Sequence, residues 1–336
     1  MVKCLITKLS GSTGNNKLLR LGEMRIRIAK VDNPTKATQG FSIEVNKPVT
    51  IEIVGNGYFT DETLTTNKGK TITLNQGFND IFVSNDGVEI AILDKYSITK
   101  ITYHTVKSSA PNPYARNISL DISDLKYSTS VVSLDLLSTQ ASGNIGDLKN
   151  LTSLVMAELS GTGVSGNIGD LKNLTSLSTL DLVGTNISGN VGDLKNLTSL
   201  STLGASNNKV PLTIHIDDLS TLTNCKFFFF KNSKLTGDLA SLPASCRFIS
   251  LSNNVSSSLT WSTRSSSSKI VAIEGNALLT NIDKMLEDQA KCQIGISDND
   301  SMYLKRIAVL GTRTSASDAA VATLQQKGYT VSVTPA

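Results

Sequence analysis

SGNIGDLKNLTSL begins at Ser142 and recurs at Ser165, and its near copy SGNVGDLKNLTSL begins at Ser188. The three copies follow one another at a constant spacing of 23 residues. A fixed period of this size is typical of a solenoid, in which one supersecondary unit stacks on copies of itself. A single coil buries too little apolar surface to offset its loss of backbone entropy, so neighbouring coils must share one core.

The repeat extends beyond its obvious copies. The spacing L-x-x-L-x-L-x-x-T-x-I-x-G, from Leu177 to Gly189, resembles the leucine-rich repeat, and it can be followed over about eight coils with steps of 21 to 25 residues. Each predicted strand is expected to point two apolar residues inward, and these two residues are two positions apart, as Ile294 and Ile296 are. The pattern predicts eight parallel strands, centred near Leu136, Leu159, Leu182, Ala205, Phe230, Leu251, Ile273 and Ile296.

A short polar side chain follows each predicted strand. Such a residue is expected to hydrogen-bond the backbone of the adjacent coil, forming an Asn/Thr ladder along the solenoid. The ladder consists of Thr139, Thr162, Thr185, Asn208, Ser233, Asn254, Asn276 and Asn299.

The region before the solenoid has a different pattern. Residues 1–107 alternate apolar and polar side chains, as in MRIRI (Met24–Ile28), with turn sequences such as NKP, GNG and NDG between the alternating segments. About six short strands of this kind predict an antiparallel β-sandwich that acts as an anchoring domain. Residues 108–116 contain SSAPNPY and are predicted to be a stiff linker, and the solenoid is assigned to residues 117–300.

Residues 301–336 are expected to cap the last coil, which would otherwise expose apolar surface. SASDAAVATLQQKG predicts a helix with Ser315 or Ser317 as N-cap and Gly328 just past its end, and TVSV predicts a final strand. The fold class predicted for the whole chain is mainly β, with an N-terminal antiparallel β-sandwich, an α/β solenoid of leucine-rich repeats and a C-terminal helix–strand cap.

Composition and motifs exclude several classes of function. Among 336 residues only 18% are charged, and the net charge of +4 is small and dispersed, so neither nucleic-acid binding nor membrane insertion is indicated. The two histidines, His104 and His215, lie in different parts of the chain without a neighbouring cysteine or carboxylate pattern. Known catalytic and nucleotide-binding motifs do not occur. We therefore expect no enzymatic activity and no cofactor.

The cysteines are expected to be structural. They have no metal-ligand spacing, and Cys225 and Cys246 fall on inward positions, where a thiol replaces an aliphatic side chain. We expect neither disulfides nor a bound metal from Cys4, Cys225, Cys246 and Cys292.

A row of aspartates accompanies the repeat, and each is followed two positions later by a lysine. Regular acidic rows can bind calcium, but calcium sites usually bring several carboxylates to one point, and here the lysines offset the charge. The preferred interpretation is that each aspartate caps a short helical turn on the convex side. The row consists of Asp124, Asp147, Asp170 and Asp193.

The concave face holds the candidate binding residues. The residue between the two inward positions of each strand is expected to point outward, and this column reads Asp135, Glu158, Asp181, Gly204, Phe229, Ser250, Ala272 and Gly295. Its three acids repel by only about 1 kcal/mol per adjacent pair in water, so they need no metal. They form a negative stripe that is one candidate binding surface.

An aromatic patch is expected beside this stripe. CKFFFFKNSK places Phe228 and Phe230 inward and Phe227 and Phe229 outward. Two exposed aromatic residues flanked by cations more often mark a contact than a tolerated surface. The predicted binding site therefore comprises Phe227, Phe229, Lys231 and Arg247, with Asp135, Glu158 and Asp181 as the second candidate.

The N-terminal segments NKPVTIEIVGNGYFTDETLTTNKGKT and VSNDGVEIAILDKYSITKIT, together with the NIGDLKNLTSL coils, resemble virion appendage proteins of the crAss-like phages that infect Bacteroidota. The resemblance implies a non-enzymatic head or tail fibre-type component, whose N-terminal domain docks to the particle while the solenoid presents a protein- or glycan-binding surface. It also implies other virion proteins as partners, a homo-oligomer, a host surface glycan or protein as ligand, and a location in the virion after assembly in the host cytoplasm.

The alternative is a bacterial cell-surface leucine-rich-repeat adhesin that lacks its signal peptide. MVKCLITKLSGSTG places a lysine on either side of a short apolar run and has no cleavage pattern, so it does not predict a signal peptide. A phage protein needs none, because it leaves the cell by lysis. A carbohydrate-active enzyme is a third interpretation, which the lack of a catalytic carboxylate pair and histidine disfavours.

Overall fold

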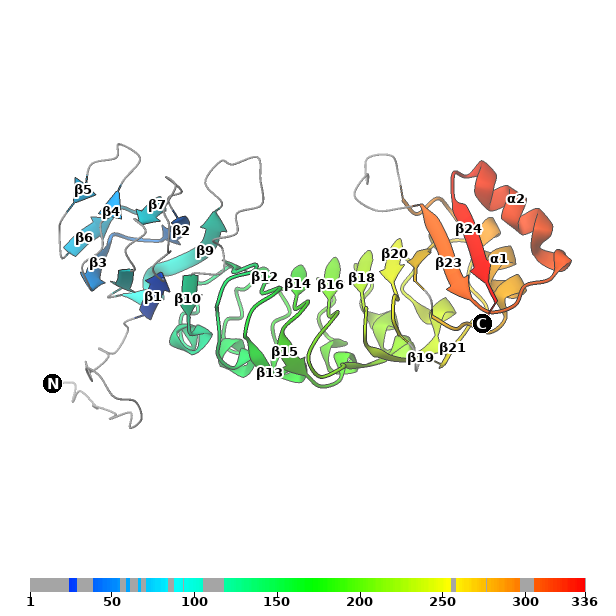
Figure 1. The fold of residues 1–336 in the computed structure, drawn as a ribbon, viewed down its shortest axis with the longest axis horizontal. Helices are drawn as coiled ribbons and strands as arrows, with labels where there is room; N and C mark the ends of the chain where they lie inside the picture. Colours follow the sequence, from blue (N-terminus) through cyan, green and yellow to red (C-terminus); the bar gives the residue numbers. More distant parts are fainter. Residues whose placement is uncertain are drawn as a thin grey trace.

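The structure is a computed structural model, and Figure 1 shows antiparallel strands at one end, a curved row of coils in the middle and a helical C-terminal end. It describes residues 24–28, 39–54, 59–60, 66–67, 71–83, 88–92, 94–104, 118–254, 258–275, 277–296 and 305–335.

The middle of the chain is a leucine-rich-repeat solenoid. Seven three-residue strands lie side by side, each parallel to the next. The middle residue of each strand is buried, and in the first six strands so is the residue two places later, as Leu180 and Leu182 are, so the leucine spacing builds one shared core. The strands are β11 (Ser133–Asp135), β12 (Met156–Glu158), β14 (Thr179–Asp181), β16 (Thr202–Gly204), β18 (Phe227–Phe229), β20 (Phe248–Ser250) and β22 (Ala272–Glu274).

Short 3₁₀ turns line the other side of the coils. They are η3 (Ile122–Leu125), η4 (Ile145–Leu148), η5 (Ile168–Leu171), η6 (Val191–Leu194), η7 (Ile216–Thr221) and η8 (Leu239–Ser241). Short parallel strands run between coils on this side, in the sheets β13 (Ser165–Asn167) with β15 (Asn186–Ser188), and β17 (Thr213–His215) with β19 (Lys234–Asp238) and β21 (Ser258–Thr260).

The predicted capping role of the aspartate row is wrong. The side chain that accepts the backbone N–H belongs to the residue three positions earlier, Asn144 for η4 and Asn167 for η5. Asp170 lies instead over the preceding coil, where a Cβ added to Gly146 would come within 2.6 Å of its Oδ2 atom. A side chain in place of the glycine of the repeated Gly-Asp pair would have to displace the next coil's aspartate.

The described residues of the Asn/Thr ladder are buried, and they make two kinds of hydrogen bond, within a coil and between coils. Thr139 and Thr162 donate to carbonyls three residues earlier in their own coils, Leu136 and Leu159, rather than to a neighbouring coil. Asn254 joins two coils as predicted: its Oδ1 accepts from the Ser233 N–H at 2.7 Å, and its Nδ2 donates to the Phe230 carbonyl at 2.7 Å. Asn208 likewise accepts from the Thr185 N–H at 3.0 Å. Asn276 and Asn299 lie outside the described residues.

Residues 294–296, where the eighth strand was predicted, are not in a strand. Ile294 is 53% exposed, and β22 pairs instead with β23 (Arg306–Leu310). The preceding segment is the helix α1 (Ile282–Lys291), whose Ile282, Met285 and Leu286 follow a helical spacing and are buried. The seven preceding coils keep their strands. In the first six the strand is centred two residues before the predicted position, on Leu134 in the first coil, and in the seventh it is centred on Ile273, as predicted.

The C-terminal cap agrees with the sequence pattern in its main elements. The helix α2 (Asp318–Gln326) is followed by Gly328 at φ +86° and by β24 (Thr330–Thr334), which pairs parallel to β23. Ser317 is the N-cap residue of α2, as predicted, but its side chain makes no capping hydrogen bond. Thr314 caps a short turn just before α2, η9 (Ser315–Ser317), by accepting from the Ala316 N–H.

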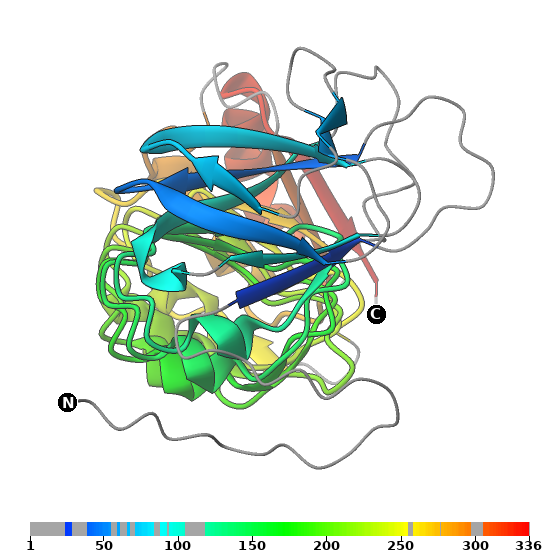
Figure 2. The same cartoon turned by 90° about the vertical axis from the view of Figure 1, so that its left-hand side faces the viewer.

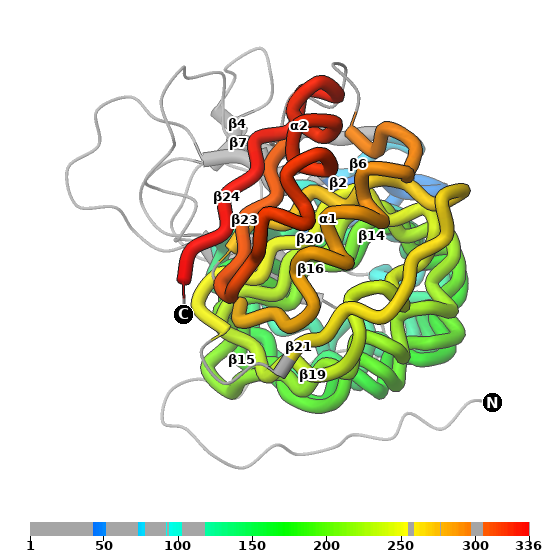
Figure 3. The backbone as a smooth tube through the Cα atoms, turned by 90° about the vertical axis from the view of Figure 1, so that its right-hand side faces the viewer, coloured from blue at the N-terminus to red at the C-terminus, as the bar shows by residue number. Residues whose placement is uncertain are grey.

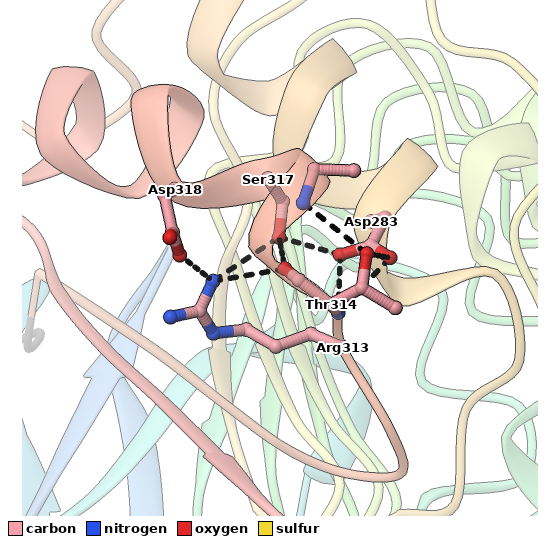
Figure 4. A network of polar contacts seen from close by, with 6 residues as sticks. Asp283, Arg313, Thr314, Ser317 and Asp318 are labelled. Carbon is pink, nitrogen blue, oxygen red and sulfur yellow. Dashed lines mark hydrogen bonds and ion pairs between the residues drawn. The ribbon is translucent and has the colours of Figure 1, made fainter.

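A polar network fastens the C-terminal cap to α1 (Figure 4). The Asp283 carboxylate accepts from the Thr314 N–H at 2.9 Å, from the Thr314 hydroxyl at 2.7 Å and from the Ser317 hydroxyl at 2.5 Å. These hydrogen bonds lower the pKa of Asp283 below its ordinary value. Arg313 pairs with Asp318 at 2.6 Å on the outer side of the network.

The N-terminal strands form antiparallel pairs and lie in front of the coils when the molecule is viewed from that end (Figure 2). One buried cluster contains side chains from both of their sheets, among them Ile43 and Ile51. The strands are β1 (Met24–Ile28), β2 (Gln39–Val45), β3 (Val49–Val54), β4 (Phe59–Thr60), β5 (Thr66–Asn67), β6 (Thr71–Leu74), β7 (Gly77–Val83), β8 (Val88–Ile92), β9 (Ile98–His104) and β10 (Ile118–Leu120).

Main-chain pairing joins this region to the solenoid. β9 pairs with β2 on one side and, in parallel, with β11 on the other, while β10 pairs with β1. The predicted division near residues 107 and 117 stays a prediction, and the linker 108–116 lies outside the described residues.

Candidate functional site

The concave sheet carries two outward columns of side chains. One runs through Asp135, Glu158, Asp181, Gly204, Phe229, Ser250 and Glu274, which lie directly opposite one another in the strand pairing. The other runs through Ser133, Met156, Thr179, Thr202, Phe227, Phe248 and Ala272. Parallel strands are about 4.8 Å apart, so side chains of one column touch their neighbours.

The predicted acidic stripe is present as three adjacent carboxylates. Burial raises the pKa of Glu158, and the flanking charges of Asp135 and Asp181 raise it further. Burial also raises the pKa of Asp181, whose Oδ1 accepts from the Val183 N–H at 3.0 Å. The stripe is therefore less acidic at its centre than isolated carboxylates would be.

A hollow opens where the stripe meets the aromatic residues. Gly204 has no side chain, whereas its column neighbours Asp181 and Phe229 do, and the space between them has a volume of about 300 Å³. We call it the Gly204 hollow. Its walls are Ser160, Asp181, Val183, Thr202, Gly204, Ser206, Asn207, Phe229 and Lys231.

The rim of the Gly204 hollow is held by hydrogen bonds between coils. The Ser206 hydroxyl accepts from the Lys231 N–H at 2.8 Å, and the Asn207 N–H donates to the Lys231 carbonyl at 2.9 Å. Ser160 donates to the Val183 carbonyl at 3.0 Å. Asn207 has a left-handed backbone, φ +57°, which asparagine adopts more readily than most residues. These contacts give the hollow fixed walls before any ligand arrives.

The walls combine three chemistries. Asp181 provides a carboxylate, Lys231 an ammonium group and Phe229 an aromatic ring, with hydroxyls and an amide between them. Asp181 and Lys231 belong to coils two strand spacings apart, so their backbones are roughly 10 Å from each other. A ligand can therefore meet a negative, an apolar and a positive group in one place.

The predicted site residues are only partly brought together. Asp181, Phe229 and Lys231 line the Gly204 hollow, and Glu158 lies beside Asp181 on the next strand. Asp135 is one strand further away. Phe227 belongs to the other column, and Arg247 lies immediately before β20, at the opposite end of the strands from Lys231. The aromatic patch and the cations thus do not form one cluster.

The aromatic residues are also less exposed than expected. Phe228 and Phe230 are fully buried, as predicted, but Phe227 and Phe229 are themselves partly buried and pack against the core. The rings of Phe229 and Phe248 are 5.6 Å apart and tilted by 45°. Replacing both outward phenylalanines would therefore disturb packing as well as the surface.

Some residues of the concave face were missed or misplaced from the sequence. Glu274, not Ala272, continues the acidic column beside Ser250, because β22 pairs two residues out of the predicted register. Gly295 is buried and lies outside the strands. Ser206 and Asn207 follow a strand end, a position from which side chains reach the concave rim.

The remaining candidate groups have structural surroundings. Cys225, Cys246 and Cys292 are buried thiols, and burial raises the pKa of Cys246 to about 12. His215 contacts Asp217 at 3.0 Å on the exposed side of a coil. Within the described residues, no group of three or more metal-ligating side chains converges. None of the helices described here has the length and apolar character needed to cross a bilayer.

Neither a protein-family model nor a curated protein matches the sequence. Solved structures that are similar include the leucine-rich-repeat ectodomain of the receptor kinase SOBIR1 from Arabidopsis thaliana, with 26% identity over 42% of this chain and 73% of that one, and a TM-score of 0.33. The Arabidopsis receptor kinase HAESA, in complex with the peptide hormone IDA and the co-receptor SERK1, is 23% identical over 52% of this chain and 31% of that one, with a TM-score of 0.41.

A leucine-rich-repeat protein of Leptospira interrogans is 15% identical over 62% of this chain and 56% of that one, with a TM-score of 0.38. The chain therefore spans less than two thirds of the HAESA and Leptospira chains.

Proposed function

We propose that this chain is a non-enzymatic binding protein whose concave face recognises a polar, cation-bearing segment of another protein at the Gly204 hollow. The observation that carries the proposal is the hollow itself, where Asp181, Phe229 and Lys231 face one space of about 300 Å³. A lysine or arginine side chain of the partner fits between the Asp181 carboxylate and the Phe229 ring, because both attract cations. Lys231 then meets a carbonyl or carboxylate of the same segment.

The acidic column supports a cationic partner. Asp135 and Glu158 continue the negative surface away from the hollow, and Lys100 of β9 lies opposite Ser133 at its far end. Lys100 is paired with Glu44 at 2.7 Å. Charge of one sign along a groove raises the association rate of oppositely charged partners and makes it sensitive to salt.

The binding proposal is tested with defined ligands. The full chain and a Gly204→Leu variant are compared on a library of peptides that contain lysine, arginine or neither, and on a glycan array. Peptides with a basic residue are expected to bind the wild type and to lose at least about tenfold in affinity with Gly204→Leu, because the leucine fills the hollow.

The matched controls lie in one coil. Lys231→Ala removes a wall of the hollow, whereas Lys234→Ala removes an exposed lysine three residues later, outside the hollow walls. Only the first is expected to weaken binding. If the wild type binds a glycan and Gly204→Leu abolishes that binding, the ligand is a glycan and not a peptide. If Gly204→Leu binds as well as the wild type does, the hollow is not the binding site.

We further propose that the protein acts in a phage particle, with the N-terminal region docked to the virion and the solenoid turned outward. The sequence resemblance to crAss-like virion appendages supports this setting. The test is mass spectrometry of purified particles, followed by cryo-electron microscopy to see which end of the chain touches the particle. A protein found on the bacterial envelope and not in particles would favour the adhesin alternative.

A further inference from the structure

The last strand, β24, forms the outer edge of the large sheet. In the described part of the chain this sheet has 14 strands in the order β24-β23-β22 and onward to β5, so β24 has a strand partner on one side only. Figure 3 shows β23 and β24 side by side at the C-terminal end, next to α1 and α2. The sheet therefore presents five residues of main chain at this edge.

The β24 edge lacks the features that usually block strand addition. Natural edges are commonly protected by a charged side chain, a proline, a bulge or a very short strand. TVSVT contains no charge and no proline, and its pairing with β23 is continuous over five residues. The opposite edge strand, β5, has two residues only. The unprotected edge thus lies at the C-terminal end.

The intrachain hydrogen bonds identify the backbone groups that face outward. The Thr330 N–H donates to the Lys305 carbonyl, and the Thr334 carbonyl accepts from the Gly311 N–H, both at 2.9 Å. Thr330 and Thr334 thus direct their main-chain groups toward β23. Because direction alternates along a strand, the N–H and C=O groups of Val331 and Val333 point to the outer edge.

The sequence of β24 reads the same in both directions. In an antiparallel pair of two such strands about Ser332, Val331 lies opposite Val333 of the second copy, and Thr330 lies opposite its Thr334. Val331 and Val333 then exchange both hydrogen bonds, which gives four across the two-fold axis. We propose that two copies of this chain pair through β24 in this register.

The side chains fit the same arrangement. Val331 and Val333 are only partly buried within one chain, and both lie on the face that packs against the core. A second β24 would extend that apolar surface and cover them further, and an isologous contact of this kind closes after two copies. The two-fold axis is perpendicular to the sheet, so both concave faces point to the same side. A contact this small is expected to give a weak dimer, with a Kd roughly in the micromolar range.

Disulfide trapping tests the register. In a Cys4→Ser background, Ser332→Cys places two thiols across the axis at a Cα separation of about 4.5 Å, which a disulfide can span. Thr330→Cys is the matched control, because its two copies would be about 13 Å apart. The described cysteines are buried and contribute little background. Mild oxidation at tens of micromolar should crosslink Ser332→Cys to a dimer at least tenfold faster than Thr330→Cys.

Charge pairing provides the second measurement. Ser332→Lys and Ser332→Glu each place like charges across the axis, so each alone should raise the dimer Kd at least tenfold in sedimentation equilibrium. An equimolar mixture should restore the dimer, which also shows that both variants are folded. Three results would each overturn the proposal. The wild type could be a monomer at these concentrations, the two cysteine variants could crosslink equally, or Ser332→Lys could leave the dimer unaffected.

Discussion

Gly204 lies directly opposite Asp181 in the parallel pairing of β14 with β16, and a Cβ on residue 204 would come within 2.6 Å of the Asp181 Oδ1 atom. The same carboxylate oxygen accepts the Val183 N–H at 3.0 Å. The missing side chain therefore does two things at once. It opens the hollow in the concave face and lets Asp181 keep its hydrogen bond to the turn after β14.

The first prediction concerns this pair. Gly204→Ala should leave stability unchanged or lower it, because the new methyl group displaces the Asp181 carboxylate. In an Asp181→Ala background the same change should raise the free energy of unfolding by about 0.5–1 kcal/mol, the usual gain when alanine replaces glycine in a strand. Urea unfolding of the wild type, the two single variants and the double variant gives the interaction energy between residues 181 and 204. Equal effects in both backgrounds would mean that the two residues do not interact.

The second prediction concerns the pH dependence of the acidic column. The folded-state pKa of Glu158 is raised, first by burial and then by Asp135 and Asp181. Protonation is thus favoured in the folded state, and stability is lost as the pH rises from about 4.3, the ordinary value for glutamate, through the raised pKa. Glu158→Gln should therefore have a higher Tm than the wild type at pH 7, and the difference should shrink toward pH 4.

A matched control exists in the same column. Glu274→Gln also removes one carboxylate, but its neighbour on β20 is Ser250 rather than another acid. No comparable gain in Tm at pH 7 is expected for this variant. If both variants gain equally, general charge reduction rather than crowding of three acids would explain the result.

Much of the solenoid could be predicted because its coils repeat the same arrangement of buried and outward side chains. Leu180 and Leu182 recur with the same spacing in successive coils, and each faces the same neighbours, so periodicity alone assigns them to the core. The outward positions followed from the same alternation, and Asp135, Glu158 and Asp181 do form one row. A regular spacing predicts contacts well when every coil is equivalent.

The prediction failed where the chain stops repeating. The apolar Ile294 and Ile296 imitate a repeat pair, but NIDKMLEDQAK carries apolar residues at positions 282, 285 and 286, a helical spacing that competes with it. The helix α1 satisfies that spacing, and the sheet continues instead through β23. The hollow at Gly204 could not be predicted from the repeat either, because its volume depends on the sizes of Asp181 and Phe229 on either side.

The third prediction concerns the buried amide ladder. Asn254 is 2% exposed and bonds Ser233 N–H and Phe230 C=O, both at 2.7 Å, so Asn254→Ala leaves two buried backbone groups without their partner. The expected loss is about 2–4 kcal/mol in the free energy of unfolding. Asn224→Ala is the control, since Asn224 also reaches the preceding coil, bonding the Thr198 carbonyl at 2.9 Å, but from an exposed position. A loss under about 1 kcal/mol is expected there, because water replaces the bond.

The last prediction concerns the attachment of the C-terminal cap. Asp283 on α1 accepts hydrogen bonds from Thr314 and Ser317, and these bonds lower its folded-state pKa. The stabilisation is therefore fully present above the ordinary aspartate pKa of about 3.9, and it is lost as the pH falls through the lower folded value. Asp283→Asn places an amide donor against these donors. At pH 7 it should speed amide exchange in α2 and β24 roughly threefold or more.

The same measurement at low pH and on a neighbouring carboxylate completes the test. The difference between Asp283→Asn and the wild type should narrow as the pH falls from about 4 through the lowered folded-state pKa, where the wild-type carboxylate protonates. Asp318→Asn is the control, because Asp318 is 62% exposed and pairs with Arg313 on the outer side of the network. Surface pairs of this kind contribute little, so α2 and β24 should exchange as in the wild type. Equal exchange in all three proteins at pH 7 would show that the contacts of β23 with β24, rather than Asp283, hold the cap in place.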